Sequence, residues 1–111
     1  KQLKIKTQNI SKFKGRKNSA IIDSIFGIGL NRAIFGTLKS VILRMNKLNK
    51  IISIDIPSGI NGDTGKILGC AVKAHTTLAL HAKKIGHTLN PGKKYSGKII
   101  VVDIGISKKF N

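Results

Sequence analysis

The sequence has few acidic residues: four aspartates and no glutamate stand against 21 lysines and arginines in 111 residues, a formal net charge of +17 at pH 7. Such an excess favours a polyanionic partner such as RNA, DNA or a membrane surface. Few side chains could stack on bases, however, with one tyrosine, four phenylalanines and no tryptophan, and the lysines are spread along the chain. We therefore favour a compositional bias toward lysine, isoleucine and asparagine, with only nonspecific binding of nucleic acid. A basic nucleic-acid-binding protein stays an alternative.

Cysteine is nearly absent too. Cys70 stands alone, so no disulfide forms within the chain, which is typical of a reducing compartment and predicts a cytoplasmic protein. A single thiol is a poor structural zinc site, and we expect Cys70 to be a small buried residue. No apolar run approaches the roughly 20 residues of a membrane span, and no signal peptide is predicted. Because the sequence does not start with methionine, we expect it to begin within a longer one.

The apolar content of 41% predicts one small globular domain. Four apolar runs are expected as strands: 20–26, 51–56, 75–81 and 98–106. Residues 37–50 have apolar side chains at helical spacing, with Thr37 as a candidate N-cap and Pro57 as the end of the following strand. The segments between these elements are expected as a linker or remnant (1–19) and as loops (27–36, 57–74, 82–97). This order predicts an α/β fold with a mostly parallel sheet covered on both faces, in which 20–26 and 51–56 lie side by side.

Three of the four aspartates lie in or near the end of a predicted strand: Asp23, Asp55 and Asp103. Asp63 lies in the turn NGDTG, and Asp103 follows an apolar run, so we expect a turn residue and a strand-end cap. Asp55 sits in IISIDIPSG, where a buried carboxylate must be paired, hydrogen-bonded or ligated. It either caps the turn at Ser58 and Gly59 or serves as a ligand-facing acid or base. With Asp23 on the neighbouring strand, an oxygen-lined cation site is a further alternative.

The loop GIGLNRAIFG (27–36) has three glycines before a predicted helix. Glycines let the backbone approach an anion, and Arg32 could add a charged contact, so the loop resembles a phosphate-binding turn. It matches neither the dinucleotide fingerprint nor the Walker loop.

Three histidines and four clustered lysines could also carry chemistry. A metal triad of His75, His81 and His87 is conceivable, but we favour loosely packed or surface histidines, since no acid lies close in sequence. The lysines are expected to be solvated: Lys83, Lys84, Lys93 and Lys94.

Three blocks together resemble a known family. DSIFGIGLNRAIFG, SIDIPSGINGDTGKILGCAVKAHTTLAL and GKIIVVDIGI, covering residues 20–106, are similar to the YjeF N-terminal domain, the NAD(P)H-hydrate epimerases. The resemblance implies a Rossmann-like three-layer α/β sandwich. It also implies an isomerase of metabolite repair, which interconverts the R and S epimers of hydrated NADH and NADPH for a partner dehydratase, commonly as a homodimer.

Site residues follow from the same resemblance. It implies one bound potassium ion with Asp23 and Ser58 as ligands, and Asp55 as the substrate-contacting acid of proton transfer. It also implies a substrate-binding loop made of Gly27, Ile28, Gly29, Leu30, Asn31, Arg32 and Ala33.

One segment of the family pattern is missing. The resemblance implies an N-N-G-G-D-G segment, with substrate contacts and a potassium ligand, ahead of these blocks, and only KQLKIKTQNISKFKGRKNSAII precedes Asp23. Residues 20–111 are therefore expected to be the C-terminal part of such a domain, with a sheet incomplete on its N-terminal side and apolar surface exposed. A complementary N-terminal chain is one expected partner. A remnant or nucleotide-binding module without catalysis is the alternative function.

Overall fold

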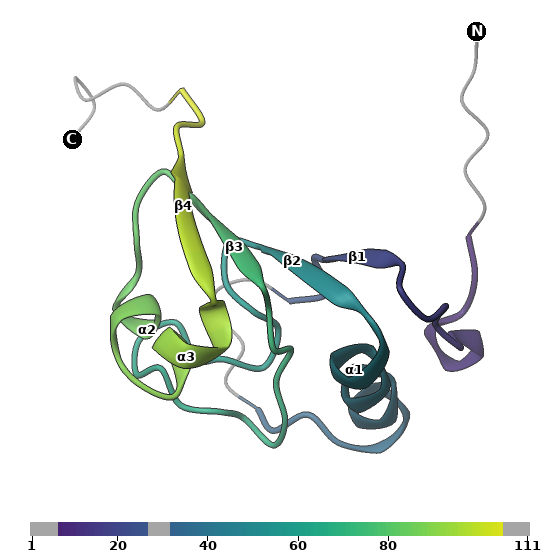
Figure 1. Cartoon of the computed structure of the whole chain (residues 1–111). Coiled ribbons are helices and arrows are strands. Elements are labelled where there is room, and N and C mark those ends of the chain that lie inside the picture. Colours follow the sequence, from purple (N-terminus) through teal and green to yellow (C-terminus); the bar gives the residue numbers. More distant parts are fainter. Residues whose placement is uncertain (1–6, 27–31, 106–111) are drawn as a thin grey trace, which may run out of the picture.

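Four parallel strands form one sheet in the computed structural model, which describes residues 7–26 and 32–105 (Figure 1). The strands follow the order β1-β2-β3-β4. Their bounds are β1 (Ala20–Asp23), β2 (Lys50–Ile54), β3 (Thr76–Leu80) and β4 (Lys98–Val102). Each pairs in parallel with the next, and Asp23 of β1 lies opposite Ser53 of β2. The predicted α/β class, the parallel sheet and the pairing of the first two strands are confirmed.

The helices differ from the expectation in one segment. The predicted helix is α1 (Gly36–Leu48), but its N-cap is Phe35 without a side-chain hydrogen bond, so the N-cap prediction for Thr37 is wrong. Two short helices, α2 (Ile85–Thr88) and α3 (Gly92–Ser96), lie where a loop was expected. Helices of four and five residues are too short to produce an apolar periodicity that a sequence could reveal. A single 3-10 turn, η1 (Ile10–Lys12), precedes the sheet.

The strands end earlier than their apolar runs. β2 ends at Ile54, before the predicted stop at Pro57, because Asp55 takes a left-handed φ of 71°. Its N–H still donates to the carbonyl of Leu78 at 2.7 Å, so Asp55 stays attached to the sheet edge. β1 likewise ends at Asp23, and the chain then turns toward Ser58.

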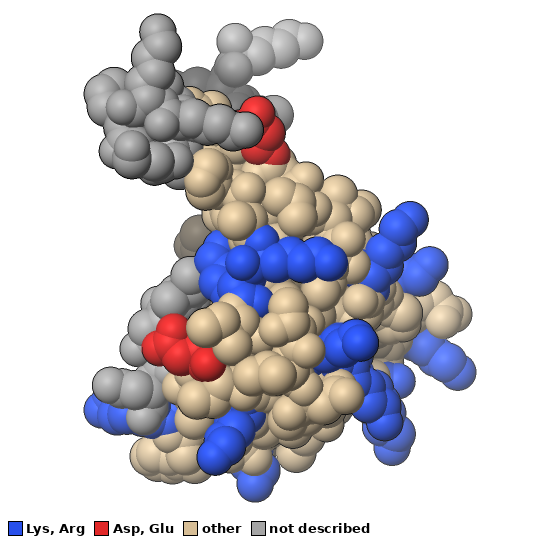
Figure 2. All heavy atoms as spheres, turned by 90° about the vertical axis from the view of Figure 1, so that its left-hand side faces the viewer, with Lys and Arg blue, Asp and Glu red and all other residues tan. Residues whose placement is uncertain are grey.

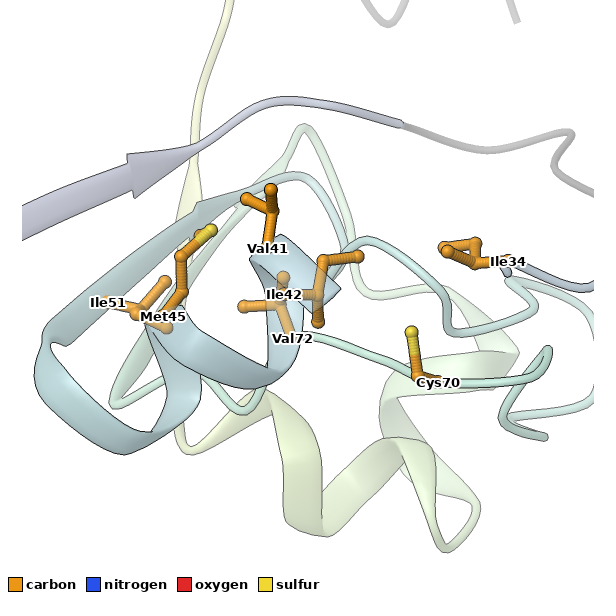
Figure 3. Close-up of a cluster of buried hydrophobic side chains, with 7 residues drawn as sticks. All are labelled: Ile34, Val41, Ile42, Met45, Ile51, Cys70 and Val72. Carbon is orange, nitrogen blue, oxygen red and sulfur yellow. The ribbon is translucent and has the colours of Figure 1, made fainter. Parts of the chain in front are cut away.

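One face of the sheet carries the main hydrophobic core. Figure 3 shows α1 packed over it, with seven buried side chains from α1, β2 and the adjoining loops: Ile34, Val41, Ile42, Met45, Ile51, Cys70 and Val72. Cys70 is buried as predicted, and burial raises the pKa of its thiol. On the same face Thr77 donates its hydroxyl to the carbonyl of Ser96 in α3 at 2.8 Å. All three α-helices lie on one side of the sheet in Figure 1.

The opposite face is apolar and uncovered by any helix of the described residues. Ile22 of β1 is 68% exposed and Ile100 of β4 is 42% exposed. Their neighbours on this face, Ile52 and Leu78, are half-buried. Parallel strands are usually covered on both faces, so residues 7–26 and 32–105 supply a sheet and one helical layer of the expected sandwich. None of their helices combines the length and hydropathy needed to cross a bilayer.

Candidate functional site

Asp23 occupies a closed pocket of hydrogen-bond donors at the end of β1. Its side chain is buried, with 1% exposure. Oδ2 accepts from the Ser53 hydroxyl at 2.7 Å and the Ser58 N–H at 2.9 Å, and Oδ1 accepts from the Ser58 hydroxyl at 2.6 Å and the Ile25 N–H at 3.3 Å. A carboxylate offers about four acceptor sites, so these neutral donors fill its capacity. The buried charge is therefore stabilised without a basic partner among these contacts.

Ser58 joins three parts of this edge. It follows Pro57, is fully buried, and donates its hydroxyl to Asp23 while accepting the N–H of Phe26 at 2.9 Å. Its carbonyl accepts from the N–H of Val72 at 2.8 Å. The structure thus brings together Asp23 and Ser58, the two residues expected to bind a cation. Carboxylate and hydroxyl oxygens are hard ligands suited to an alkali or alkaline-earth cation. The pair is of the right chemical type for such an ion, which would take the place of one or more of the four donors on Asp23.

The candidate phosphate-binding loop begins beside this pair. Phe26 is fixed to Ser58 before the loop, and Ile34 donates its N–H to the carbonyl of Leu68 after it, at 2.9 Å. Residues Gly27, Ile28, Gly29, Leu30 and Asn31 lie outside the described residues, and Arg32 and Ala33 are exposed. A hollow of about 230 Å³ adjoins the loop and is lined by Phe26, Arg32, Ala33, Ile34, Phe35 and Leu38.

Asp55, at the end of the next strand, has a different environment. Its carboxylate is 14% exposed and Oδ1 pairs with the ammonium of Lys84, whose side chain is 22% exposed. The same ammonium donates to the carbonyl of Leu80 at 3.1 Å. A left-handed φ costs an L-residue about 1–2 kcal/mol, although aspartate tolerates it better than most. The strained backbone and the ion pair together set the direction of the Asp55 side chain.

His87 hydrogen-bonds to the backbones of both residues of this ion pair. It is 1% exposed, and Nδ1 accepts from the N–H of Lys84 at 2.8 Å. Nε2 therefore carries the proton and donates to the carbonyl of Asp55 at 2.6 Å. Burial lowers the pKa of His87, which keeps the ring neutral at pH 7. One imidazole thus fixes the backbones of both members of the ion pair.

The sequence did not predict the contacts that Lys84 and His87 make with Asp55. Lys84 was expected to be solvated and His87 to be loosely packed, and both expectations are wrong because the chain after β3 folds back over the end of β2. No local pattern separates Lys84, which pairs with Asp55, from the exposed Lys83. The functional neighbour of Asp55 lies 29 residues away in sequence, where no motif connects them.

The remaining candidates have simpler surroundings. Asp63 lies in a turn where the side-chain oxygen Oδ1 of Asn61 accepts its N–H at 2.8 Å, and the side chain of Asp103 accepts the N–H of Gly105 at 2.8 Å. Both predictions, a turn residue and a strand-end cap, are confirmed. His75 accepts the N–H of Ile51 at 3.2 Å, and His81 is exposed. In residues 7–26 and 32–105 no three His, Cys, Asp or Glu side chains gather as a metal site.

The positive charge is dispersed on one face of the described residues. On the face shown in Figure 2, Lys and Arg side chains lie among uncharged residues rather than along one groove. This face therefore offers no concentrated basic track for a nucleic acid.

Comparison with known proteins identifies the family. The sequence model described as "YjeF-related protein N-terminus" matches residues 1–86. The chain belongs to the YjeF N-terminal family. The resemblance read from residues 20–106 is thereby confirmed, and the match also includes residues 1–19, which were expected to be a linker or remnant.

Curated relatives of the YjeF N-terminal chain are named NAD(P)H-hydrate epimerase. The chain is 42% identical over 88 residues to the NAD(P)H-hydrate epimerase of Limosilactobacillus reuteri (strain ATCC 55730 / SD2112), and the match covers 78% of this chain and 42% of the relative. Identity to the protein of Leuconostoc citreum is 45% over 87 residues, 78% of this chain and 39% of the relative. Identity to the protein of Lentilactobacillus buchneri is 44% over 91 residues, which cover 81% of this chain and 42% of the relative. The chain thus spans about two fifths of the length of these relatives.

Proposed function

We propose that this chain forms part of an NAD(P)H-hydrate epimerase, an isomerase that interconverts the R and S epimers of hydrated NADH and NADPH in cofactor repair. The observation that carries the proposal is the sheet edge at which Asp55 presents a partly exposed carboxylate, one strand away from the buried pair of Asp23 and Ser58. Relatives with 42–45% identity bear the epimerase name. In open α/β sheets ligands bind at the carboxyl ends of the strands, where these three residues lie.

Asp55 is the proposed proton-transfer group. Epimerisation at the hydrated ring carbon requires one of its bonds to oxygen or nitrogen to break and to re-form on the opposite face. The departing group takes up a proton as the bond breaks and gives it back as the bond re-forms, and a carboxylate within reach of the substrate suits this general acid–base work. Oδ1 of Asp55 is engaged by Lys84, and no donor among the described residues contacts Oδ2. Oδ2 is therefore the atom that we assign to proton exchange with the substrate.

Asp23 and Ser58 are the residues that would hold potassium. Their oxygens are of the hard type that such an ion prefers. The ion would replace donors that now fill the carboxylate, such as the Ser58 hydroxyl, which hydrogen-bonds Oδ1 of Asp23 at 2.6 Å. A bound potassium ion would supply positive charge for the substrate's phosphates or hydroxyls. The loop residues 27–33, with Arg32 at their exposed end, would contact the nucleotide part of the substrate.

The uncovered sheet face is the proposed contact with further polypeptide. It presents Ile22 and Ile100 to solvent beside half-buried apolar neighbours. The curated relatives have more than half of their length outside the matched part. We propose that a segment with amphipathic helices covers this face and contributes the N-N-G-G-D-G motif, in a cytoplasmic homodimer that serves a dehydratase.

The test is epimerisation of hydrated NADH, followed by chromatography of the two epimers with potassium present. The chain is assayed alone and with a polypeptide that carries the N-N-G-G-D-G segment, and catalysis above the spontaneous rate is expected in the second mixture at least. Asp55→Asn should remove this rate, whereas Asp103→Asn, the matched change at an exposed strand-end carboxylate, should retain it. A spontaneous rate in both mixtures, or full activity of Asp55→Asn, would contradict the proposal.

A further inference from the structure

We propose that Lys84 is a positioning residue for Asp55: its ammonium holds one carboxylate oxygen so that the other faces the substrate. The inference rests on the proposed acid–base function of Asp55. It concerns a residue that carries no recognisable signal in the sequence and that lies in a segment expected to be solvated loop.

The first argument is that both ends of the ion pair are fixed at their backbones. Asp55 is held by its N–H on Leu78 and by its carbonyl, which accepts from His87. Lys84 is held by its N–H on the other nitrogen of the same imidazole. An ordinary surface pair gains little stability because two long side chains must be ordered. Here the buried His87 ring fixes the backbones of both residues, so the two side chains lose less conformational entropy when they pair.

The second argument concerns the ammonium itself. It donates to Oδ1 of Asp55 and to the carbonyl of Leu80, the last residue of β3. Two acceptors from two neighbouring strands fix the charge above the sheet edge. A carboxylate held by one oxygen has its second oxygen aimed in a defined direction, and such orientation of a reacting group is a large part of catalysis.

The contrast with the adjacent lysine supports the assignment. Lys83 is exposed, while Lys84 is half-buried in the ion pair. The two side chains carry the same charge one residue apart, so general electrostatics of the basic surface affects both alike. The contacts of Lys84 with Asp55, Leu80 and His87 distinguish the two residues. Lys83 is therefore the matched control for the charge alone.

The experiment compares Lys84→Met, Lys84→Arg and Lys83→Met after circular dichroism has shown that each variant is folded. The first readout needs no activity: carbodiimide-coupled labelling of carboxyl groups, located by mass spectrometry, with Asp63 and Asp103 as internal references. Lys84→Met should label several-fold faster at Asp55 than the parent, whereas Lys83→Met should not. Lys84→Arg, which keeps a charged donor, should stay close to the parent.

The second readout is the kinetics of epimerisation in whichever mixture is active. Lys84→Met should lower kcat by roughly tenfold to a hundredfold, the effect of misplacing a reacting group, with KM nearly unchanged, and Lys84→Arg should recover part of kcat. A purely structural role of Lys84 would not lower kcat selectively at constant KM, and it would not predict recovery of kcat by Lys84→Arg.

The outcomes separate the two proposals. Equal labelling of Asp55 in Lys84→Met and the parent overturns the positioning proposal, whether or not the chain is active. An active Lys84→Met variant with parental kcat overturns it as well. Faster labelling in a chain that never epimerises the substrate would leave the Lys84 contact established and contradict the epimerase function.

Discussion

Two aspartates follow neighbouring strands at one sheet edge, yet their surroundings are opposite. Asp23 is buried and accepts four hydrogen bonds from neutral donors. Asp55 is partly exposed, stands on a left-handed backbone and pairs with one cation, Lys84. The first carboxylate has its acceptor capacity filled by the fold, whereas the second has an oxygen that no described donor contacts.

The difference indicates that the two carboxylates have different roles, one in the stability of the fold and one in the reaction. A buried carboxylate with complete hydrogen bonding connects β1, β2 and the turn at Ser58, so its removal should be felt by the whole sheet edge. Strained backbone and incomplete pairing are typical of functional positions, where the local cost is offset elsewhere. We therefore expect stability to depend mainly on Asp23 and activity mainly on Asp55.

The largest effect is expected from Asp23→Ala. The substitution leaves the buried Ser53 hydroxyl and the Ser58 N–H without an acceptor. Each such donor costs about 1–3 kcal/mol, so a loss of roughly 3 kcal/mol or more in the free energy of unfolding is expected. Urea denaturation followed by circular dichroism measures it. Asp103→Ala, at an exposed carboxylate with one hydrogen bond, should change stability by about 0.5 kcal/mol or less. Similar losses in the two variants would remove the distinction drawn for Asp23.

Ser58→Ala should have the next largest effect. The buried hydroxyl is both a donor to Asp23 and the acceptor for Phe26, so its removal should cost about 1–3 kcal/mol. Ser40→Ala on the exposed side of α1, where the hydroxyl only contacts the carbonyl of Gly36 at 3.4 Å, is the matched control. A potassium-dependent rise in Tm that Ser58→Ala loses would further support the ligand role proposed for Ser58.

The sequence predicted the parts of this edge that depend on local pattern. Apolar runs that contain an aspartate placed Asp23 and Asp55 in or near strand ends, and the parallel crossover brought β1 and β2 together. The sequence did not predict that Asp55 would leave the strand with positive φ, since the isoleucines on either side of it suggest continued extension. Nor did it predict Lys84 and His87, because their contacts depend on how α2 folds back over β2.

The uncovered face illustrates the same limit. The continuous apolar runs of β1 and β2 predict apolar side chains on both faces of the sheet, but they do not show which face the helices cover. That choice is made by α1 and α3, which pack on Ile51 and Thr77, and the short α3 has no sequence period of its own. Long periodic elements were therefore predictable, and short elements held by tertiary contacts were not.

The backbone at Asp55 offers a smaller test of the comparison. Asp55→Gly removes the carboxylate but suits the left-handed φ of 71°, while Asp55→Ala removes it and keeps the strain. The glycine variant should be the more stable by about 1 kcal/mol, measured by thermal unfolding, and both should lack epimerase activity. At a position with ordinary φ, such as Asp23 in β1, glycine should be no better than alanine. An alanine variant at position 55 as stable as the glycine variant would show that the backbone is not strained there.

The smallest expected effect is the pH dependence from His87. Burial lowers its pKa in the folded protein, so as pH falls through the ordinary value of about 6.5 the unfolded chain binds the proton first and folding stability decreases. The loss should stay below about 1 kcal/mol between pH 7 and pH 6 and stop below the folded pKa, with full stability above about pH 7. Denaturation curves at several pH values should show this slope in the parent and in His81→Asn, where the replaced ring is exposed, and not in His87→Gln. A slope that persists in His87→Gln would mean that another group titrates, and the neutral ring assigned between Lys84 and Asp55 would lose its support.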